Sequence, residues 1–324
     1  MGKRAKGRSL QDFFPLNAAE QRILEAAAAG DLAEIGTTRP EAESDSNTVR
    51  ATFLRFLALG GDDEAPVHER GLWVQGAWIT GGLDLSHAEI AGPTVFERCR
   101  FDETAILRDA RIAGPFSLEG SHLPGLNADR LTCRSGLFLR NGFSAAGEVR
   151  LLGAKISSNL DCSCGKFENP NGHAINADGM DVGLNLVMSH RFIARGEVRL
   201  LGATIGGNWE CDGGIFVNPK GRAISADRMN VRGYIFMKNG FKARGEIHLS
   251  GVTIGGNLEC DGGIFENQGK VAIHADGMKV DGNVFVRHGF SALGEVRLIN
   301  ASIGCDFDCS LGSFYSQNSF AINF

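Results

Sequence analysis

The sequence predicts an all-β solenoid, a right-handed quadrilateral β-helix of about ten coils with a short α-helical N-terminal cap. Three signals support this fold, and each repeats every 49 residues. Gly-Glu-Val or Gly-Glu-Ile recurs from Gly147 to Gly294, and a cysteine recurs from Cys162 to Cys309. Ala-Asp recurs in the same way from Ala128 onward. Because the three patterns keep one phase, a single structural unit is repeated along the chain.

Each 49-residue unit divides into two similar halves of about 23 to 26 residues, and each half predicts one coil. One half begins at Ile247 and the next at Ile273, and both repeat the pattern apolar-x-apolar. Apolar residues at i and i+2 place both side chains on one face of a short strand. Polar residues and glycines between the pairs turn the chain through corners. At about 4.8 Å per coil, ten coils form a rod roughly 50 Å long.

The coil pattern extends upstream to Leu72. Its register is less regular between Leu85 and Leu126, where we expect a bulge or a loop. We therefore divide the chain into a basic flexible tail (residues 1–16), a helical N-terminal cap (residues 17–71) and the β-helix (residues 72–324).

Two helices are expected in the cap. Asn17 and Glu20 form a capping-box pattern before the alanine-rich run that ends at Gly30, which predicts a helix over residues 18–29. A second helix is expected from about Thr48 to Leu59, and residues 31–47 are interpreted as a linker. Because an open strand edge recruits other chains, we expect this helical pair to cover the first coil.

Composition and charge limit the function classes. Hydrophobic residues make up 43% of the chain and the net charge is only −5. From residue 72 onward, 24 basic residues face 26 acidic ones, so we expect no nucleic-acid partner. The basic N-terminus leads into Leu10-Gln11-Asp12 rather than an apolar signal sequence, and no run has the length of a membrane span. These features predict a cytoplasmic protein with reduced thiols.

A small residue two positions before a central isoleucine recurs in five coils, in Ala77-Trp78-Ile79, Ala110-Arg111-Ile112, Ala154-Lys155-Ile156, Ala203-Thr204-Ile205 and Ala301-Ser302-Ile303. This pattern resembles the pentapeptide-repeat β-helix proteins over about 250 residues, although most coils here carry extra residues at one corner. That family includes DNA-mimic inhibitors of topoisomerases, which are strongly acidic.

The segment Val49–Leu57, followed by Gly60-Gly61 and Pro66-Val67-His68, resembles a second group, of bacterial proteins. Members of this group are often labelled membrane-associated oxidoreductases. The resemblance implies redox chemistry, but the sequence contains no cofactor-binding motif that would support it, and we expect no cofactor.

In each coil, the residue that stands between the two members of the third apolar pair should face solvent. These residues stack as a row that we name the carboxylate–aromatic ridge, and they are our candidates for binding a protein partner. The carboxylates are Asp161, Glu210, Glu259 and Asp308, and the apolar residues in the intervening coils are Phe138, Val187, Phe236 and Phe285. A row of aromatic groups among polar ones is typical of a protein interface, although single exposed apolar residues are also common on strands.

A second row, the basic ridge, is expected on another side. It consists of Arg150, Arg199, His248 and Arg297, alternating with Asn176, Ser225 and His274. We interpret it as a solvated face, with contact to phosphate or to an acidic partner as the alternative.

The cysteine row predicts core packing rather than metal binding. Successive members from Cys162 to Cys309 lie two coils apart, roughly 9.6 Å, which is too far for a disulfide or for one zinc ion. Cys162 and Cys164 form only a Cys-x-Cys pair without further ligands nearby in sequence. We therefore expect no metal site.

The last residues match the repeat one step after residues 270–275, so a further coil should begin there. Either this coil pairs with a second copy in a homodimer or more chain follows in a parent protein. Phe320, Ile322 and Phe324 are the candidates for self-association.

No catalytic motif is present, and the leading hypothesis is a non-enzymatic scaffold that binds a protein partner. One alternative is a nucleic-acid mimic that inhibits a topoisomerase-type enzyme. The other is a carbohydrate-active or redox enzyme, for which spaced carboxylates or a polar cluster would be needed. The polar residues of the irregular region are the place for such a cluster: His87, Glu89, Glu97, Arg98, Asp102 and Glu103.

Overall fold

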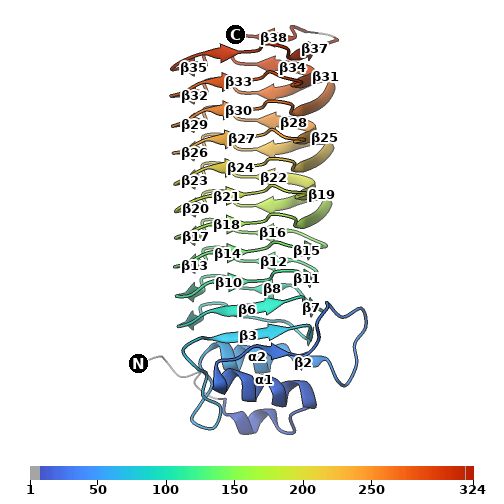
Figure 1. Cartoon of the computed structure of the whole chain (residues 1–324), viewed down its shortest axis with the longest axis vertical. Coiled ribbons are helices and arrows are strands. Elements are labelled where there is room, and N and C mark those ends of the chain that lie inside the picture. The colour runs from blue at the N-terminus through green and yellow to red at the C-terminus, as the bar shows by residue number, and fades with distance from the viewer. Residues whose placement is uncertain (1–7, 318) are drawn as a thin grey trace.

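A computed structural model, which describes residues 8–317 and 319–324, shows a parallel β-solenoid with helices at its N-terminal end (Figure 1). The predicted all-β solenoid with an α-helical cap is confirmed. One sheet contains 12 strands, of which β1 (Ala33–Glu34) belongs to the cap, so the solenoid has about eleven coils.

Each coil has up to four sides, which we number in chain order. The first side is the 12-stranded sheet, and the fourth is a 10-stranded sheet. The second and third sides are two rows of the 16-stranded sheet, because in the later coils one long strand runs through both of them. The four-sided coil therefore agrees with the four apolar segments that the sequence contains in each half-repeat.

The first side contains β3 (Leu72–Gln75), β6 (Thr94–Glu97), β10 (Phe116–Ser117), β14 (Leu137–Phe138), β18 (Leu160–Asp161), β21 (Leu186–Val187), β24 (Trp209–Glu210), β27 (Ile235–Phe236), β30 (Leu258–Glu259), β33 (Val284–Phe285) and β36 (Phe307–Asp308). The fourth side contains β5 (Glu89–Ile90), β9 (Arg111–Ile112), β13 (Thr132–Cys133), β17 (Lys155–Ile156), β20 (Asp181–Val182), β23 (Thr204–Ile205), β26 (Asn230–Val231), β29 (Thr253–Ile254), β32 (Lys279–Val280) and β35 (Ser302–Ile303).

The second side begins with β4 (Trp78–Thr80), β7 (Arg100–Phe101), β11 (His122–Leu123) and β15 (Ser144–Ala145), and the third with β8 (Ala105–Ile106), β12 (Leu126–Asn127) and β16 (Val149–Arg150). The strands that continue through both sides are β19 (Lys166–Asn176), β22 (Ile193–Arg199), β25 (Ile215–Ser225), β28 (Lys242–His248), β31 (Ile264–His274) and β34 (Ser291–Arg297). The last coil ends with β37 (Ser313–Tyr315) and β38 (Ile322–Asn323).

The 49-residue period arises from two coil lengths. Successive strands of the first side begin at Leu160, Leu186 and Trp209, which gives steps of 26 and 23 residues. The longer coils carry 11-residue strands at the corner between the second and third sides, whereas the shorter coils carry 7-residue strands there. These longer corners project from the rod at the right of Figure 1.

The expected bulge or loop between Leu85 and Leu126 is wrong. Strands of the first side begin at Leu72, Thr94 and Phe116, at even steps of 22 residues, and stack in parallel without interruption. These early coils lack the long corner between the second and third sides. The early coils are therefore shorter than those of the 49-residue repeat and do not match its sequence spacing, although their strands stack in the same way.

Aromatic and sulfur-containing side chains fill the interior. A phenylalanine ladder places one ring in each of eight successive coils, with neighbouring ring centroids 5.0–5.4 Å apart, along Phe143, Phe167, Phe192, Phe216, Phe241, Phe265, Phe290 and Phe314. Cys162, Cys211 and Cys260 are buried in the same core. Burial raises the pKa of these thiols, so they stay protonated at neutral pH. The prediction of a core role is confirmed for these three and is wrong for Cys309, which is exposed in the last coil.

The cap combines helices with strands that continue the sheets. Helix α1 (Ala18–Ala29) begins at the predicted Asn17 capping box and ends at Gly30. The second predicted helix is shorter, because its first residues form β2 (Thr48–Arg50) and only Ala51–Ala58 form α2. β2 pairs with β4.

The expected linker contains β1, which pairs with β3. Together with β2 it covers strand edges of the first coil, so the cap protects the solenoid by sheet pairing as well as by helix packing.

The chain before α1 is not a simple flexible tail. Leu10–Phe13 form a 3-10 helix (η1), and Leu10 and Phe13 are buried, with the Phe13 ring against Phe53 and Phe56 of α2. The basic residues Lys3, Arg4 and Lys6 lie outside the described residues. No helix in the described part of the chain has the length and apolar character needed to cross a membrane.

Candidate functional site

The carboxylate–aromatic ridge forms one continuous row on the first side of the solenoid. Backbone pairing joins Phe138 to Asp161, and each later member pairs with the next one up to Asp308. All eight side chains are half-buried. The stacking that the sequence predicted is present, but these side chains are less exposed than an open strand face would make them.

Basic side chains cover much of this ridge. Arg140, Lys238 and Arg287 each stand two residues after a ridge phenylalanine and lie over its ring, 4.7, 4.5 and 3.9 Å from the centroid. Cations over aromatic faces attract the ring electrons and shield the ring from water. In these three coils, one face of the ridge phenylalanine ring is therefore covered by a basic side chain of the same protein.

The same cations pair with the carboxylates of the next coil. Arg140 contacts Asp161 at 2.9 Å and Arg287 contacts Asp308 at 2.8 Å, and Lys238 forms the equivalent ion pair with Glu259. Anions and cations alternate along the row. This alternation differs from the continuous acidic surface that a nucleic-acid mimic requires.

Hydrogen bonds favour the charged form of one ridge carboxylate, Asp308. Hydrogen bonds from Ser310 and then from Arg287 lower the pKa of Asp308 to about 2. The pKa of Arg140 is raised although burial alone would lower it, because Asp161 and Glu119 accept its hydrogen bonds. A glycosidase needs one carboxyl group with a raised pKa as its general acid, and Asp308 is shifted in the opposite direction.

One coil interrupts the ridge. In β21 and the residues after it, Val187 stands in place of the phenylalanine and Ser189 in place of the cation. The carboxylate of Glu210 in the next coil therefore forms no ion pair with any residue of the described chain, and the one hydrogen bond that it accepts there comes from Asn185, at 3.3 Å. A shallow hollow of about 290 Å³ lies here, lined by Ser189, His190, Glu210, Asp212, Phe236 and Lys238.

An exposed aromatic ring stacks on Phe236, one of the residues that line this hollow. Just before five strands of the first side (β18, β21, β24, β30 and β33), an asparagine accepts a hydrogen bond from the backbone of the next coil, as Asn185 does from Asn208 at 2.9 Å. Tyr234 replaces the asparagine before β27. Its ring is 41% exposed and stacks on Phe236, with centroids 5.7 Å apart and an interplanar angle of 3°.

We name Val187, Ser189, Glu210, Tyr234 and Phe236 the ridge gap. Glu210 and Phe236 were predicted from the sequence as candidates, but Ser189 and Tyr234 were missed. Both depart from what the other repeats carry at their positions, and this departure was visible in the aligned repeats.

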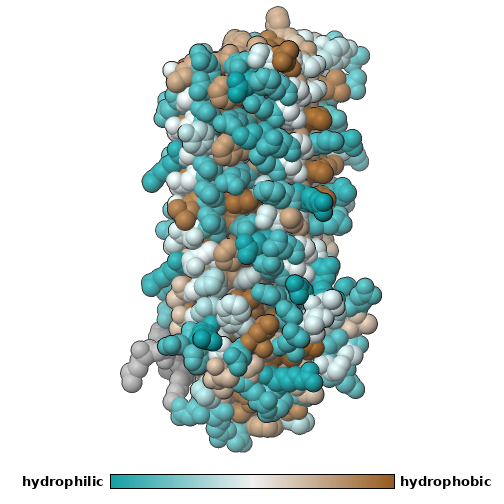
Figure 2. All heavy atoms as spheres, in the orientation of Figure 1, coloured by the Kyte–Doolittle hydropathy of each residue, from teal (hydrophilic) through white to brown (hydrophobic). Residues whose placement is uncertain are grey.

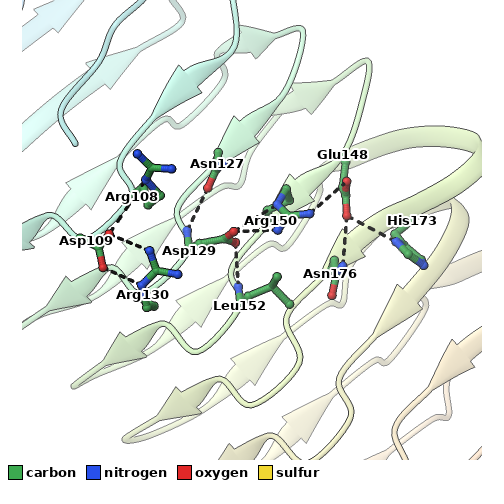
Figure 3. A network of polar contacts seen from close by, with 10 residues as sticks. All are labelled: Arg108, Asp109, Asn127, Asp129, Arg130, Glu148, Arg150, Leu152, His173 and Asn176. Carbon is green, nitrogen blue, oxygen red and sulfur yellow. Dashed lines mark hydrogen bonds and ion pairs between the residues drawn. The ribbon is translucent and has the colours of Figure 1, made fainter. Parts of the chain in front are cut away.

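The basic ridge lies on the third side, and its arginines form ion pairs, as Figure 3 shows for Arg150. Arg150 contacts Asp129 at 2.7 Å, and Arg199 and Arg297 contact Asp178 and Asp276 at 2.5 and 2.6 Å. These aspartates belong to the Ala-Asp repeat. Asp129 also accepts a hydrogen bond from the backbone N–H of Leu152 in the next coil, as Figure 3 shows. The row is thus a ladder of ion pairs rather than a free basic surface.

The polar residues proposed for an enzyme alternative do not converge. Glu89 lies on the fourth side, Glu97 at the end of β6 on the first, and Asp102 and Glu103 directly follow β7 on the second. His87 lies at a corner, 3.8 Å from Asp109, and Arg98 donates a hydrogen bond to the carbonyl of Thr37. They do not gather around one point where a substrate could be held.

A larger hollow, of about 680 Å³, lies where the end of α2 meets the first coils. Its ionisable lining residues include Glu89 and Arg111, which form an exposed 3.5 Å ion pair. Both side chains of this pair are exposed to solvent, so the hollow does not shield either of them from water.

The last coil exposes apolar side chains. Phe320 and Phe324 are 71% and 67% exposed, whereas Ile322 is half-buried in β38. The Phe324 ring contacts Phe307 edge-on, with centroids 5.3 Å apart. The three residues proposed for self-association thus lie together on the final coil.

No protein-family model, curated protein or solved structure matches this chain. The resemblance to pentapeptide-repeat proteins therefore stays a prediction, and so does the resemblance to the bacterial group.

Proposed function

We propose that this chain is a non-enzymatic scaffold that binds a protein partner at the ridge gap on the first side of the solenoid. The observation that supports this most directly is Glu210, a half-buried carboxylate that forms no ion pair within the described residues. It lines a hollow together with Phe236, on which the exposed ring of Tyr234 stacks. In the other repeats the equivalent carboxylates, Asp161, Glu259 and Asp308, are each paired with a cation from the chain itself.

The partner would supply the missing cation. A lysine or arginine side chain of a bound protein segment would take the place that Arg140, Lys238 and Arg287 fill in other coils. Its charge would pair with Glu210, and apolar parts of the segment would pack on Tyr234. Aromatic and arginine contacts of this kind dominate many protein interfaces. A stacked solenoid is already ordered, so little conformational entropy is lost on its side of the interface.

A variant that restores the residues of the neighbouring coils tests this proposal. Ser189→Lys with Tyr234→Asn supplies the missing cation internally and completes the asparagine row. We expect the variant to fold like the wild type and to bind its partner at least about tenfold more weakly, because a lost central contact costs about 1.4 kcal/mol or more. The measurement is affinity purification from native cells with quantitative mass spectrometry.

The matched control is Thr253→Lys, which adds a lysine on the fourth side, where Lys155 and Lys279 already stand at equivalent positions. It should leave partner capture unchanged. Equal capture by the wild type and by the Ser189→Lys, Tyr234→Asn variant would remove the ridge gap as the binding site.

We also propose that the final coil can pack against a second copy of the chain. The support is the exposed pair Phe320 and Phe324. Light scattering should give a dimer mass for the wild type and a monomer mass for Phe320→Asp with Phe324→Asp. A monomer mass for both would contradict self-association through this coil.

A cytoplasmic location is likewise a proposal. All eight cysteines lie within the described residues, and none forms a disulfide. Unpaired thiols are typical of reducing compartments.

A further inference from the structure

The basic ridge contains one departure from its own repeat. At the two positions where other repeats carry Arg and Asn, or Arg and Ser, the third repeat carries His248 and His274. Each repeat also places the glutamate of Gly-Glu-Val or Gly-Glu-Ile beside these positions, and here it is Glu246. Two imidazoles and a carboxylate therefore meet in adjacent coils.

The three side chains converge on one point. The Oε1 atom of Glu246 lies 3.8 Å from Nε2 of His248 and 3.4 Å from Nδ1 of His274, and the three donor atoms all lie within 4.8 Å of one another. Donor atoms at about 2.0–2.1 Å from a tetrahedral zinc ion are about 3.3 Å apart. Small side-chain rotations would bring the observed distances to this value.

The other nitrogen of each imidazole has a carboxylate partner. Nδ1 of His248 forms a short hydrogen bond with Asp227, and Nε2 of His274 lies 3.1 Å from Asp276. This arrangement would hold each proton on the outer nitrogen and leave the inner nitrogen's lone pair directed at Glu246. Carboxylate–histidine–metal triads in metalloproteins have the same order.

The outer carboxylates are themselves fixed by the next coil. Asp227 accepts a 3.1 Å hydrogen bond from the N–H of Ser250, and Asp276 accepts one of 3.1 Å from Ile299. Arg297 also contacts Asp276 at 2.6 Å. Both partners of the imidazoles are therefore anchored by backbone contacts before any ligand binds.

We propose that Glu246, His248 and His274 form a binding site for a divalent transition-metal ion of the zinc type. Imidazole nitrogen and carboxylate oxygen are ligands that suit zinc. His248 is buried, while Glu246 and His274 are half-buried, so the inner wall is shielded and the outer side remains open to solvent. A fourth position on that side would take water or a group from a bound partner.

The alternative is a purely structural role, in which the imidazoles replace the arginine and asparagine as hydrogen-bonding groups between carboxylates. Both roles predict that the cluster holds the coils together. They differ in stoichiometric metal binding, which a structural ladder does not require.

The test is a titration of the full chain, without an affinity tag, with zinc chloride, measured by isothermal titration calorimetry. We expect one zinc equivalent, together with a rise in Tm on adding zinc, because a ligand that binds the folded state stabilises it. Cobalt should bind the same site and show no sulfur-to-cobalt charge-transfer band.

The discriminating variant is His248→Arg with His274→Asn, which restores the residue pair of the first repeat, Arg150 and Asn176. We expect it to lose the zinc equivalent while its unfolding without metal resembles that of the wild type. The converse graft, Arg150→His with Asn176→His, should add a second equivalent at Glu148. Absence of stoichiometric zinc in the wild type, or unchanged binding in the His248→Arg, His274→Asn variant, would overturn the proposal.

Discussion

Replacing Phe216 with alanine should lower the free energy of unfolding by about 3–5 kcal/mol, the usual cost of deleting a buried aromatic ring. Phe216 is fully buried, and its ring lies 5.1 Å from Phe192 and 5.4 Å from Phe241 in the adjacent coils. The truncation removes contacts on both sides and leaves a cavity in the middle of the ladder. Denaturant unfolding followed by far-ultraviolet circular dichroism measures the loss.

Phe285→Ala is the matched control, because Phe285 is half-buried on the ridge under Arg287 rather than inside the core. It should cost clearly less, about 1–2 kcal/mol, in proportion to the smaller apolar area it buries. Hydrogen exchange should accelerate mainly in the coils next to residue 216, since each coil contacts only its neighbours. Equal losses for the two variants would show that the ladder is not the main source of stability.

Gly245→Ala should destabilise the solenoid by about 2 kcal/mol or more. Gly245 has a φ of +114°, and an added Cβ would lie 2.3 Å from the carbonyl oxygen of Asn218 and 2.8 Å from that of Gly221. The long corner of the preceding coil folds against this glycine. The corner is held at both ends, because Val217 pairs with Arg244 and Arg222 pairs with Glu246, so the substitution forces the residues between them outward.

Gly277→Ala is the control for that substitution. Gly277 has a φ of +64°, and a Cβ there would meet nothing within 4 Å. Arg130 and Arg228 already occupy the equivalent position with similar φ angles of 55° and 56°. The cost should be only about 1 kcal/mol, from the left-handed backbone. Thermal unfolding of both variants measures the difference, and similar Tm values would contradict the close approach at Gly245.

Much of the fold could be predicted because each coil must bury apolar residues at the same strand positions, and the repeat shows this requirement many times. Leu160, Leu186 and Trp209 recur in phase, and their backbone pairing follows directly from that phase. The errors occurred where local pattern and long-range pairing disagree. Val49 fits a helical apolar stripe, yet it pairs with Ile79 in the first coil, and only that distant strand edge makes residues 48–50 extended.

The site was harder to predict than the fold. Alternation along a strand identifies which residues point outward, and Phe236 and Glu259 were found in this way. It does not show that Lys238 lies over the Phe236 ring and pairs with Glu259. Those contacts depend on the conformation of a long side chain that reaches from one coil to the next. The informative residues proved to be those that break the repeat, such as Ser189 and Tyr234.

The central claim, that the ridge gap contacts a protein partner, is tested most directly by site-specific photo-crosslinking in native cells. A photoreactive amino acid at position 234 would be compared with one at Thr253 on the fourth side, and crosslinked proteins would be identified by mass spectrometry. We expect one dominant crosslinked protein from position 234, none from position 253, and loss of the product when Ser189→Lys is added. No product from position 234, or the same products from both positions, would contradict it.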